Sequence, residues 1–503
     1  KPRMRKIFVT ILCTAFLGIF ACSSDSDTDS ATPQNKALAV DVNSIAFLSA
    51  GNSVSITVTN TADTWTISSS DSSWIQLSKT SGNSGSSLVS ITASANTATT
   101  ARSATITVKS SQADPVQITV NQPATTIIPP VTDLYPSYNI NPIAADATGM
   151  NSTAVQLAAN IKLGWNIGNS LEATGGETAW GNPKVTKALI DLVKANGFNA
   201  IRIPCSWNQN LANTANAQIK SEWLARVKEV VQYCVDNDMY VIVNIHWDGG
   251  WLENNCTEAK KVENNAKQKA FWEQIATSLR GFDEHLLFAS ANEPNVENAT
   301  QMAVLNSYHQ TFIDAVRSTG GKNAYRNLII QGPSTDIEKT NKLMTTLPTD
   351  IVPNRMMAEV HFYPYQFTLM TKDESWGKMF YYWGAGNHST TDTAHNPTWG
   401  EEADVDKFFL SMKTQFVDKG IPVILGEFGA IRRSDLTGTA LTLHLKSRAD
   451  FLKYVVKSSK ANGLIPFYWD AGNLGVNTMS LFDRSNNTVY DSQALTALQD
   501  GLK

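Results

Sequence analysis

The C-terminal part of the chain, residues 137–503, repeats one pattern, in which a short apolar segment is followed by a stretch of helical periodicity. The apolar segments have few polar positions among their Val, Ile and Leu residues, which is typical of strands buried on both faces. We expect eight such strands, at residues 161–166, 198–203, 240–245, 286–291, 327–331, 356–362, 422–426 and 464–469.

Amphipathic helices are predicted between several of these strands. One helical face is formed by Trp223, Val227, Val230, Val231 and Cys234. A second helix is predicted over residues 184–196, with Gly197 as its stop signal. Eight successive β-α units predict the α/β class and a (β/α)8 TIM barrel. A doubly wound open sheet is the alternative, but no GxGxxG or Walker signature supports it.

Residues 38–124 have a different pattern. Apolar and polar residues alternate in short segments such as 53–58 and 104–108, and turns rich in Gly, Ser, Asn and Asp separate them. This predicts a small all-β, immunoglobulin-like sandwich, and the segment resembles the BACON module of bacterial carbohydrate-active enzymes. Trp65 and Trp74 could stack on sugar rings, but we interpret them as core residues and the module as a spacer. Residues 125–136 contain paired prolines and are predicted to form an extended linker.

The N-terminus has the features of an exported protein. Basic residues precede an apolar run from Ile7 to Phe20, which is shorter than the roughly 20 residues that span a bilayer. The run ends at Ile19-Phe20-Ala21-Cys22, which resembles a bacterial lipobox. The segment 23–29, which contains Asp25, Asp27 and Asp29, resembles a surface-lipoprotein export tag. We expect a signal peptide over 1–21, lipidation of Cys22, a flexible acidic tether over 22–37, and an outer-membrane lipoprotein facing the cell exterior. The alternative is an ordinary signal peptide followed by a tether.

Charge and cysteine content exclude several functional classes. A net charge of -4 and a pI near 6.0 provide no basic field for nucleic acid. The five cysteines have no CxxC or zinc-finger spacing, so neither a disulfide framework nor a zinc site is expected, and Cys205 is expected to be buried. The seven histidines include no HExxH pair. We therefore expect no metal and no cofactor, and we expect a monomer.

Polar and aromatic side chains gather where the predicted strands end. In a (β/α)8 barrel the carboxyl ends of the strands surround the active site, so these residues should meet. They are Arg202, His246, Asn292, Glu293, His361, Tyr363, Glu427 and Trp469. The two-residue repeat of a strand predicts that Glu427 shares a face with Val423 and Leu425, and that Glu359 shares a face with His361 and Tyr363.

Two of these residues are glutamates on different strands. Cleavage of a glycosidic bond requires such a pair, because one carboxyl protonates the leaving oxygen while the other attacks the anomeric carbon. A single carboxylate at a strand end is commonly a helix cap. Two carboxylates accompanied by Arg, His, Asn, Tyr and Trp on separate strands instead indicate an active site.

The motifs Asn292-Glu293-Pro294 and Gly426-Glu427-Phe428-Gly429, in order with the other strand-end residues, resemble glycoside hydrolase family 5 over residues 137–503. The resemblance implies that Glu293 is the general acid/base and Glu427 the nucleophile of a retaining enzyme. It also implies supporting roles at the substrate for the remaining six residues. Arg202 and Tyr363 would keep Glu427 ionised, Asn292 would bind the sugar 2-hydroxyl, His246 and His361 would orient carboxylates and hydroxyls, and Trp469 would form the floor of the -1 subsite.

Residues 163–173 and 180–183 resemble the subfamily 4 branch of that family. This implies an endo-β-1,4-glucanase, and xyloglucan is the favoured substrate. Cellulose and mixed-linkage glucan are the alternatives, followed by mannan and xylan. Trp247, Trp251 and Trp376 are expected to extend the cleft, with Trp383 as a further candidate. The alternative of another class is a non-catalytic glycan-binding surface lipoprotein, although such a protein need not keep both glutamates.

Overall fold

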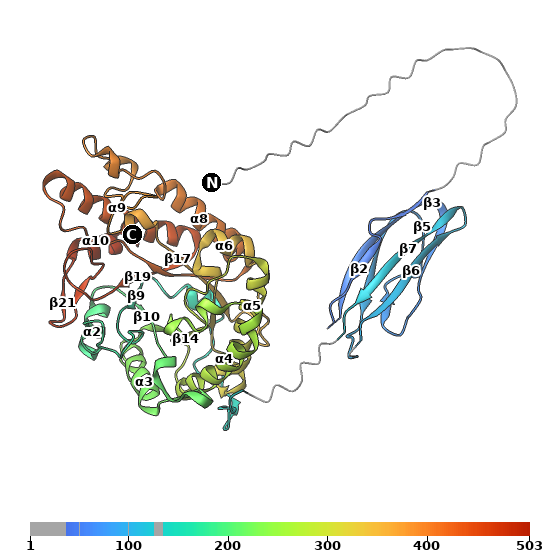
Figure 1. Ribbon diagram of the computed structural model, residues 1–503, viewed down its shortest axis with the longest axis horizontal. Helices are drawn as coiled ribbons and strands as arrows, with labels where there is room; N and C mark the ends of the chain where they lie inside the picture. Colours follow the sequence, from blue (N-terminus) through green and yellow to red (C-terminus); the bar gives the residue numbers. More distant parts are fainter. Residues whose placement is uncertain (1–36, 50, 99, 125–133) are drawn as a thin grey trace, which may run out of the picture. The chain divides into compact units, whose positions relative to one another are not determined.

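The computed structural model describes residues 37–49, 51–98, 100–124 and 134–503, and the chain divides into two compact units, residues 1–130 and 131–503 (Figure 1). The predicted signal peptide, Cys22, nearly all of the acidic tether and residues 125–133 of the predicted linker lie outside the described residues. Among the residues that are described, no helix is both long enough and apolar enough to cross a membrane.

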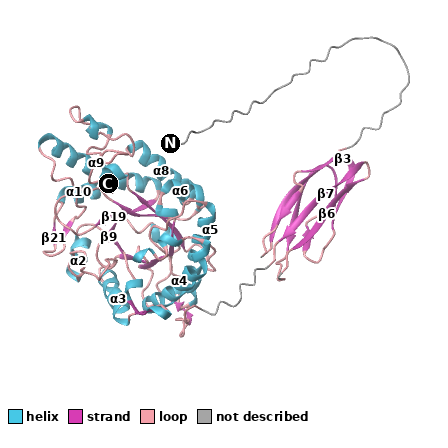
Figure 2. Ribbon diagram, viewed as in Figure 1, coloured by secondary structure: helices cyan, strands magenta, loops and turns pink. Residues whose placement is uncertain are grey.

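The N-terminal unit is built of strands and loops (Figure 2). Its seven-stranded sheet has the order β2-β7-β6-β3-β5-β4, and β1 pairs with β3. The long strand β3 changes register between Asn60 and Thr64, and such an irregularity bends a strand and increases its twist. The strands are β1 (Leu38–Val40), β2 (Ser44–Ala46), β3 (Asn52–Ser69), β4 (Ile75–Leu77), β5 (Ser81–Ala93), β6 (Arg102–Ser110) and β7 (Ala113–Gln122). The predicted all-β sandwich is confirmed.

Both tryptophans of this unit lie in its core, as predicted. Trp65 is fully buried and donates its indole N–H to the carbonyl of Asn83 at 3.1 Å. Trp74 is buried as well, and its indole N–H binds Asp71 at 3.0 Å. Because both rings are enclosed and both polar tips are satisfied, neither presents a face to a sugar.

The second unit contains a closed barrel of parallel strands in the order β10-β13-β14-β16-β17-β18-β19-β9. All eight predicted strands are present, with ends that differ by at most a few residues. They are β9 (Gly164–Ile167), β10 (Ala200–Ile203), β13 (Tyr240–Asn244), β14 (Leu286–Ala289), β16 (Leu328–Gln331), β17 (Met356–Phe362), β18 (Val423–Phe428) and β19 (Leu464–Asp470). Short two-residue to three-residue strands pair outside the barrel: β8 (Ile143–Ala145) with β15 (Gly320–Gly321), β11 (Leu211–Asn213) with β12 (Gln218–Ile219), and β20 (Phe482–Asp483) with β21 (Thr488–Val489).

Helices surround the barrel (Figure 2). They are α1 (Ala154–Ala158), α2 (Lys187–Ala195), α3 (Ser221–Val235), α4 (Glu258–Leu279), α5 (Ala299–Ser318), α6 (Ile337–Leu343), α7 (Tyr365–Thr368), α8 (Glu402–Gln415), α9 (Gly438–Asn462) and α10 (Ser492–Gly501). The predicted apolar face of α3 is buried, as expected. Helix α2 begins three residues later than predicted, because the extended residue Thr186 caps it by accepting a hydrogen bond from the Leu189 N–H.

The inside of the barrel is apolar at one end only. Ile242, Leu287, Ile329, Met357 and Ile424 form a buried cluster near the strand starts, together with Ala154 and Leu157 of α1. A larger core lies between the strands and the helices. Apolar side chains fill the interior of the barrel near the strand starts. Polar side chains therefore have room inside the barrel only near the carboxyl ends of the strands.

The predicted face of Glu427 is wrong. Val423 and Leu425 pack in the core between strands and helices, whereas the Glu427 carboxylate lies 2.8 Å from the guanidinium of Arg202, inside the barrel. Strand β18 changes register between Leu425 and Phe428, and this irregularity breaks the two-residue repeat and redirects the side chain. The parity predicted for Glu359, His361 and Tyr363 is confirmed, because all three side chains reach the same site.

Candidate active site

The guanidinium of Arg202, at the end of β10, forms the centre of the predicted cluster. It donates from Nη1 to Glu427 Oε1 at 2.8 Å and from Nη2 to Asn292 Oδ1 at 2.8 Å, and its Nε lies 3.0 Å from Glu359 Oε1. Nη1 also donates to Asn166 Oδ1 at 3.0 Å. Arg202 is fully buried, and burial would lower its pKa, but the charges of Glu359 and Glu427 raise the pKa instead. This arginine is therefore a permanent cation, and its contacts hold Glu427, Asn292 and Glu359 in position.

Glu293 and Glu427 face each other across His361. One oxygen of each carboxylate and one ring nitrogen of His361 all lie within 4.8 Å of one another. His361 Nδ1 is 2.7 Å from Glu293 Oε1 and 3.8 Å from Glu427 Oε2. Barrel closure thus brings together two glutamates that are far apart in the sequence, on the same rim of the barrel.

The two glutamates have different surroundings. Glu427 is buried and accepts hydrogen bonds from Arg202 and from the Tyr363 hydroxyl, the latter at 3.2 Å. Glu293 keeps 45% of its side chain exposed, and its Oε1 is bonded to His361 and contacted by the Thr335 hydroxyl at 3.5 Å. Glu427 therefore has fixed protein donors, whereas Glu293 is solvated in part by water.

His361 carries a positive charge at neutral pH. Burial alone would lower the pKa of this histidine, but the charge of Glu427 and hydrogen bonds to Glu293 and Glu359 raise its pKa to about 10. Its Nε2 lies 3.1 Å from Glu359 Oε1, so each ring nitrogen faces a carboxylate. Glu293, His361 and Glu427 have the spacing of a metal site, but both ring nitrogens of His361 already face carboxylates, Nδ1 that of Glu293 and Nε2 that of Glu359. The contacts fit an acid–base cluster.

In the ligand-free site the two carboxyl groups are shifted in opposite directions. Burial would raise the pKa of Glu293, but the hydrogen bond and charge of His361, together with Arg202, lower its pKa. Burial raises the pKa of Glu427, and the charge of Glu293 adds to this effect. Since the two groups interact strongly, they titrate as a pair, and any change in the water around Glu293 redistributes the proton between them.

His246 and Trp469 form a stacked pair at the other side of the site. Their ring centroids are 5.8 Å apart and the ring planes are inclined by 12°. His246 is a neutral ring, because burial and the charges of Arg202 and His361 hold its pKa well below the ordinary value. Trp469 is partly buried, and the pair provides a flat, uncharged surface next to the carboxylates.

The structure brings together all eight strand-end residues, and two of them bind mainly other residues of the cluster. Arg202 is fully buried and Asn292 nearly so, and Asn292 uses its amide to join Arg202 to Glu253, donating from Nδ2 to Glu253 Oε1 at 2.9 Å. Both residues act mainly by positioning others.

Sequence reasoning assigned no role to three residues that contact the cluster. Glu359 binds Arg202 and His361, and its place two residues before His361 on one strand face is a signal that could have revealed it. Asn166, at the end of β9, donates from Nδ2 to the carbonyl of Gly426 at 2.8 Å. Glu253 lies in a loop, where no periodicity marks it.

Gly426, next to the nucleophile candidate, is required by close packing. A Cβ atom at this position would lie 2.1 Å from Glu359 Oε1. Glycine lets β18 approach the buried carboxylate of Glu359 directly.

The aromatic residues predicted to extend the cleft divide into two groups. Trp247 is exposed, and Trp376 is 62% exposed with its ring 6.0 Å from that of exposed Tyr365, which was not predicted. The cleft role predicted for Trp251 is not supported: only 9% of it is exposed, its indole N–H binds Asp248 at 2.9 Å and its ring packs edge-on to Phe271. Trp383 is likewise buried and donates its indole N–H to the carbonyl of Gly400.

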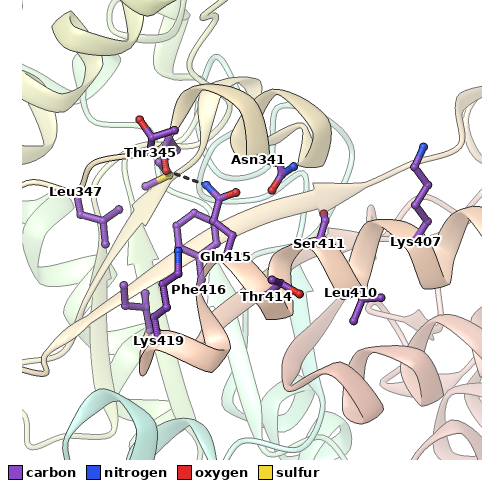
Figure 3. A pocket seen from close by; sticks show the side chains of 12 residues that line it. Asn341, Thr345, Leu347, Lys407, Leu410, Ser411, Thr414, Gln415, Phe416 and Lys419 are labelled. Carbon is purple, nitrogen blue, oxygen red and sulfur yellow. Dashed lines mark hydrogen bonds between the residues drawn. The ribbon is translucent and has the colours of Figure 1, made fainter. Parts of the chain in front are cut away.

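A groove is lined by residues of α6, of α8 and of the segments that follow these two helices (Figure 3). Its lining includes Met344, Leu410 and Phe416, and Gln415 donates to the carbonyl of Met344 at 2.9 Å. The lining has lysines but no carboxylate. This groove therefore lacks the carboxylate pair that lies at the barrel rim.

Both units of the chain are similar to known proteins. Residues 166–475 match the family described as cellulase (glycosyl hydrolase family 5), and residues 63–123 match the BACON family. The xyloglucan-specific endo-beta-1,4-glucanase of Bacteroides ovatus is 38% identical over 520 residues, which cover 99% of this chain and 96% of that protein. Endoglucanase A of Paenibacillus barcinonensis is 36% identical over 385 residues, covering 71% and 93%. The structure of a Bacteroides ovatus GH5 xyloglucanase in complex with a XXXG heptasaccharide superposes with a TM-score of 0.70 and 37% identity, covering 93% of this chain and 99% of that one.

We predict that His361 remains an imidazolium until about pH 10, whereas His246 remains neutral at pH values well below the ordinary pKa of a histidine. Nitrogen-15 NMR of histidine-labelled protein distinguishes the two forms, and His361→Gln and His246→Gln assign the signals. Glu359→Gln should move the His361 transition down by about one pH unit, because a neighbouring negative charge is lost. A His361 signal that titrates near pH 6.5 would contradict the charge assigned to the site.

Proposed function

The chain belongs to glycosyl hydrolase family 5, and from this premise we propose that it is a retaining endo-β-1,4-glucanase in which Glu293 is the general acid/base and Glu427 the nucleophile. The observation that carries the proposal is the separation of the two carboxylates, whose nearest oxygens lie within 4.8 Å. Direct attack with retention needs about 5–5.5 Å, whereas inversion needs roughly 6.5–9.5 Å to admit a water molecule.

In the first step an oxygen of Glu427 attacks the anomeric carbon and the bond to the leaving oxygen breaks. The proton of Glu293 passes to that oxygen, so the shortened chain leaves as an alcohol. In the second step Glu293, now ionised, takes a proton from water while the water oxygen attacks the same carbon and releases Glu427. Arg202 and Tyr363 supply donors to Glu427 whenever it is ionised.

The cycle requires the proton to be on Glu293 when substrate is bound. In the free site part of the Glu293 side chain is exposed to solvent, and a bound sugar would cover it, which raises the pKa of a carboxyl group. Glu427 keeps its donors from Arg202 and Tyr363 in either state. Substrate binding thus favours protonated Glu293 and ionised Glu427.

The flat surface of Trp469, backed by His246, suits the apolar face of a pyranose ring in the -1 subsite. Asn292 has one amide hydrogen that is not used by Glu253, and this hydrogen could reach the 2-hydroxyl. Trp247, Tyr365 and Trp376 offer further exposed rings for neighbouring sugars. Several separate aromatic platforms suit internal attack on a long chain.

For the substrate we propose xyloglucan. The similarity to the xyloglucan-specific relative of Bacteroides ovatus extends over 99% of the chain, including the N-terminal unit, whereas the relative named endoglucanase A covers 71%. Because the second relative is named an endoglucanase, cellulose and mixed-linkage glucan are the alternative substrates.

A panel of polysaccharides tests this proposal. We expect kcat/KM on xyloglucan to exceed that on mixed-linkage glucan and on soluble cellulose by about tenfold or more, the range that pocket contacts can discriminate. Sizing of the products should show early internal cuts. Exclusive cleavage of mannan would contradict the glucanase assignment.

The two glutamates should respond differently to substitution. Glu427→Gln should abolish turnover and preserve binding, because the nucleophile is lost while the cleft is intact. Glu293→Ala should slow polysaccharide hydrolysis by roughly 10³-fold, with a much smaller loss on aryl glycosides whose leaving groups need no proton. Equal losses of Glu293→Ala on both substrates would argue against an acid role.

We further propose that the protein is an outer-membrane lipoprotein facing the cell exterior, with Cys22 as the lipidated residue and the N-terminal unit as a spacer. The lipobox-like motif and the acidic segment after it support this proposal. The enclosed Trp65 and Trp74 support the spacer role. Cys22→Ser should abolish palmitate labelling and release activity from the membrane fraction, and retention of both would refute lipidation at this residue.

A further inference from the structure

We propose that Glu253 is a positioning residue for the acid/base, which holds Asn292 and Glu293 in place and uses its own negative charge to favour the proton on Glu293. The proposal rests on the function given above and adds a residue that lies outside the strand-end motifs. Glu253 begins a short helical turn, Glu253–Asn255, in the loop after β13.

A single carboxylate oxygen of Glu253 binds two consecutive residues of the active site. Its Oε1 accepts from Asn292 Nδ2 at 2.9 Å and from the backbone N–H of Glu293 at 2.5 Å. Two further bonds join the same two loops, because Asn295 donates its backbone N–H to the Glu253 carbonyl and its side-chain amide to Asn254, both at 2.8 Å. The segment that carries the acid/base is thereby attached to the loop of the neighbouring strand.

The contacts continue to the nucleophile. Asn292, oriented by Glu253, accepts from Arg202 Nη2, and Arg202 donates to Glu427. A displacement of Glu253 would therefore disturb both members of the catalytic pair.

Hydrogen bonding alone does not explain the choice of a glutamate. Glu253 is only 5% exposed, and no lysine, arginine or histidine forms an ion pair with it among the described residues. Glu359, at similar depth, is paired with both Arg202 and His361. A buried carboxylate without a cation is costly, and glutamine could accept the same two bonds without a charge. A buried glutamate without a cation partner thus points to a role for its carboxyl group in the reaction.

The groups that face Glu253 define this role. Burial raises its pKa to about 7, and the charges of Glu293 and Glu427 act in the same direction, against hydrogen bonds from the Glu293 N–H and Asn292. Cys256 in the same loop has a pKa near 12 and is neutral. Because the interaction between two charges is mutual, ionised Glu253 favours protonation of Glu293 to the same extent. A general acid must hold its proton near the working pH, and the negative charge of Glu253 helps Glu293 to do so.

The test compares three variants of the full-length enzyme over a range of pH on polysaccharide. Glu253→Gln keeps an acceptor for both hydrogen bonds and removes the charge, so the alkaline limb of kcat/KM should move down by about one pH unit. Glu253→Ala should show the same shift and a lower kcat at every pH, because Asn292 and Glu293 also lose their acceptor. Glu297→Gln is the matched control: this glutamate is on the same segment as Glu293 but exposed and paired with Lys339, and its loss should not move the limb.

An alkaline limb that is unchanged in Glu253→Gln would overturn the proposal, whether or not kcat falls, since a purely structural role lowers kcat without moving the limb. An activated aryl glycoside separates this outcome from failure of the proposed function. On that substrate the first step needs no acid, so Glu253→Gln should match the wild type in that step. If Glu293→Ala retains the wild-type alkaline limb on polysaccharide, the assignment of Glu293 itself fails.

Discussion

The buried guanidinium of Arg202 is the interaction on which the site depends. It reaches Glu427 on β18, Glu359 on β17, Asn292 after β14 and Asn166 on β9, and so connects five strands of the barrel including its own. Removing a cation of this kind from water costs several kcal/mol, which only charged partners with good geometry can offset. The carboxylates at the barrel rim are therefore as necessary to the arginine as the arginine is to them.

This arrangement needs a barrel with two different ends. Apolar residues close the interior near the strand starts, and helix α1 packs against them, so water and polar groups are confined to the other end. There the position of Glu427 depends on the register change in β18. Leu425 points outward, toward the helices, and the register change lets the Glu427 side chain point into the barrel. The site depends on an irregularity in an otherwise regular sheet.

Much of this could be read from the sequence. The eight strands, the buried face of α3 and the meeting of eight strand-end residues follow from periodicity and from the rule that parallel strands end on one edge. The sequence could not predict on which face of β18 the Glu427 side chain lies, because it does not show where a strand changes register. The burial of Trp251 could not be predicted either. A tryptophan after a strand end looks the same in the sequence whether its indole N–H reaches solvent or, as here, binds a buried aspartate. Glu253 gave no signal because loops lack periodicity, and only the folded contacts connect it to Glu293.

The charges around the catalytic pair explain how one carboxyl group keeps a proton. Among the described residues, the cluster has two cations, Arg202 and His361, and four carboxyl groups, Glu253, Glu293, Glu359 and Glu427. Glu359 contacts both cations. Glu427 has Arg202 and Tyr363 as donors, and the charge of Arg202 opposes the rise of its pKa that burial causes. These two carboxyl groups are therefore the best placed to ionise. The cations are then balanced, and a third or fourth negative charge would be uncompensated in a largely buried site. Once sugar has displaced the water from Glu293, binding a proton there is the simplest way to avoid that charge. The imbalance between cations and carboxyl groups therefore favours the protonated acid that glycosidic bond cleavage requires.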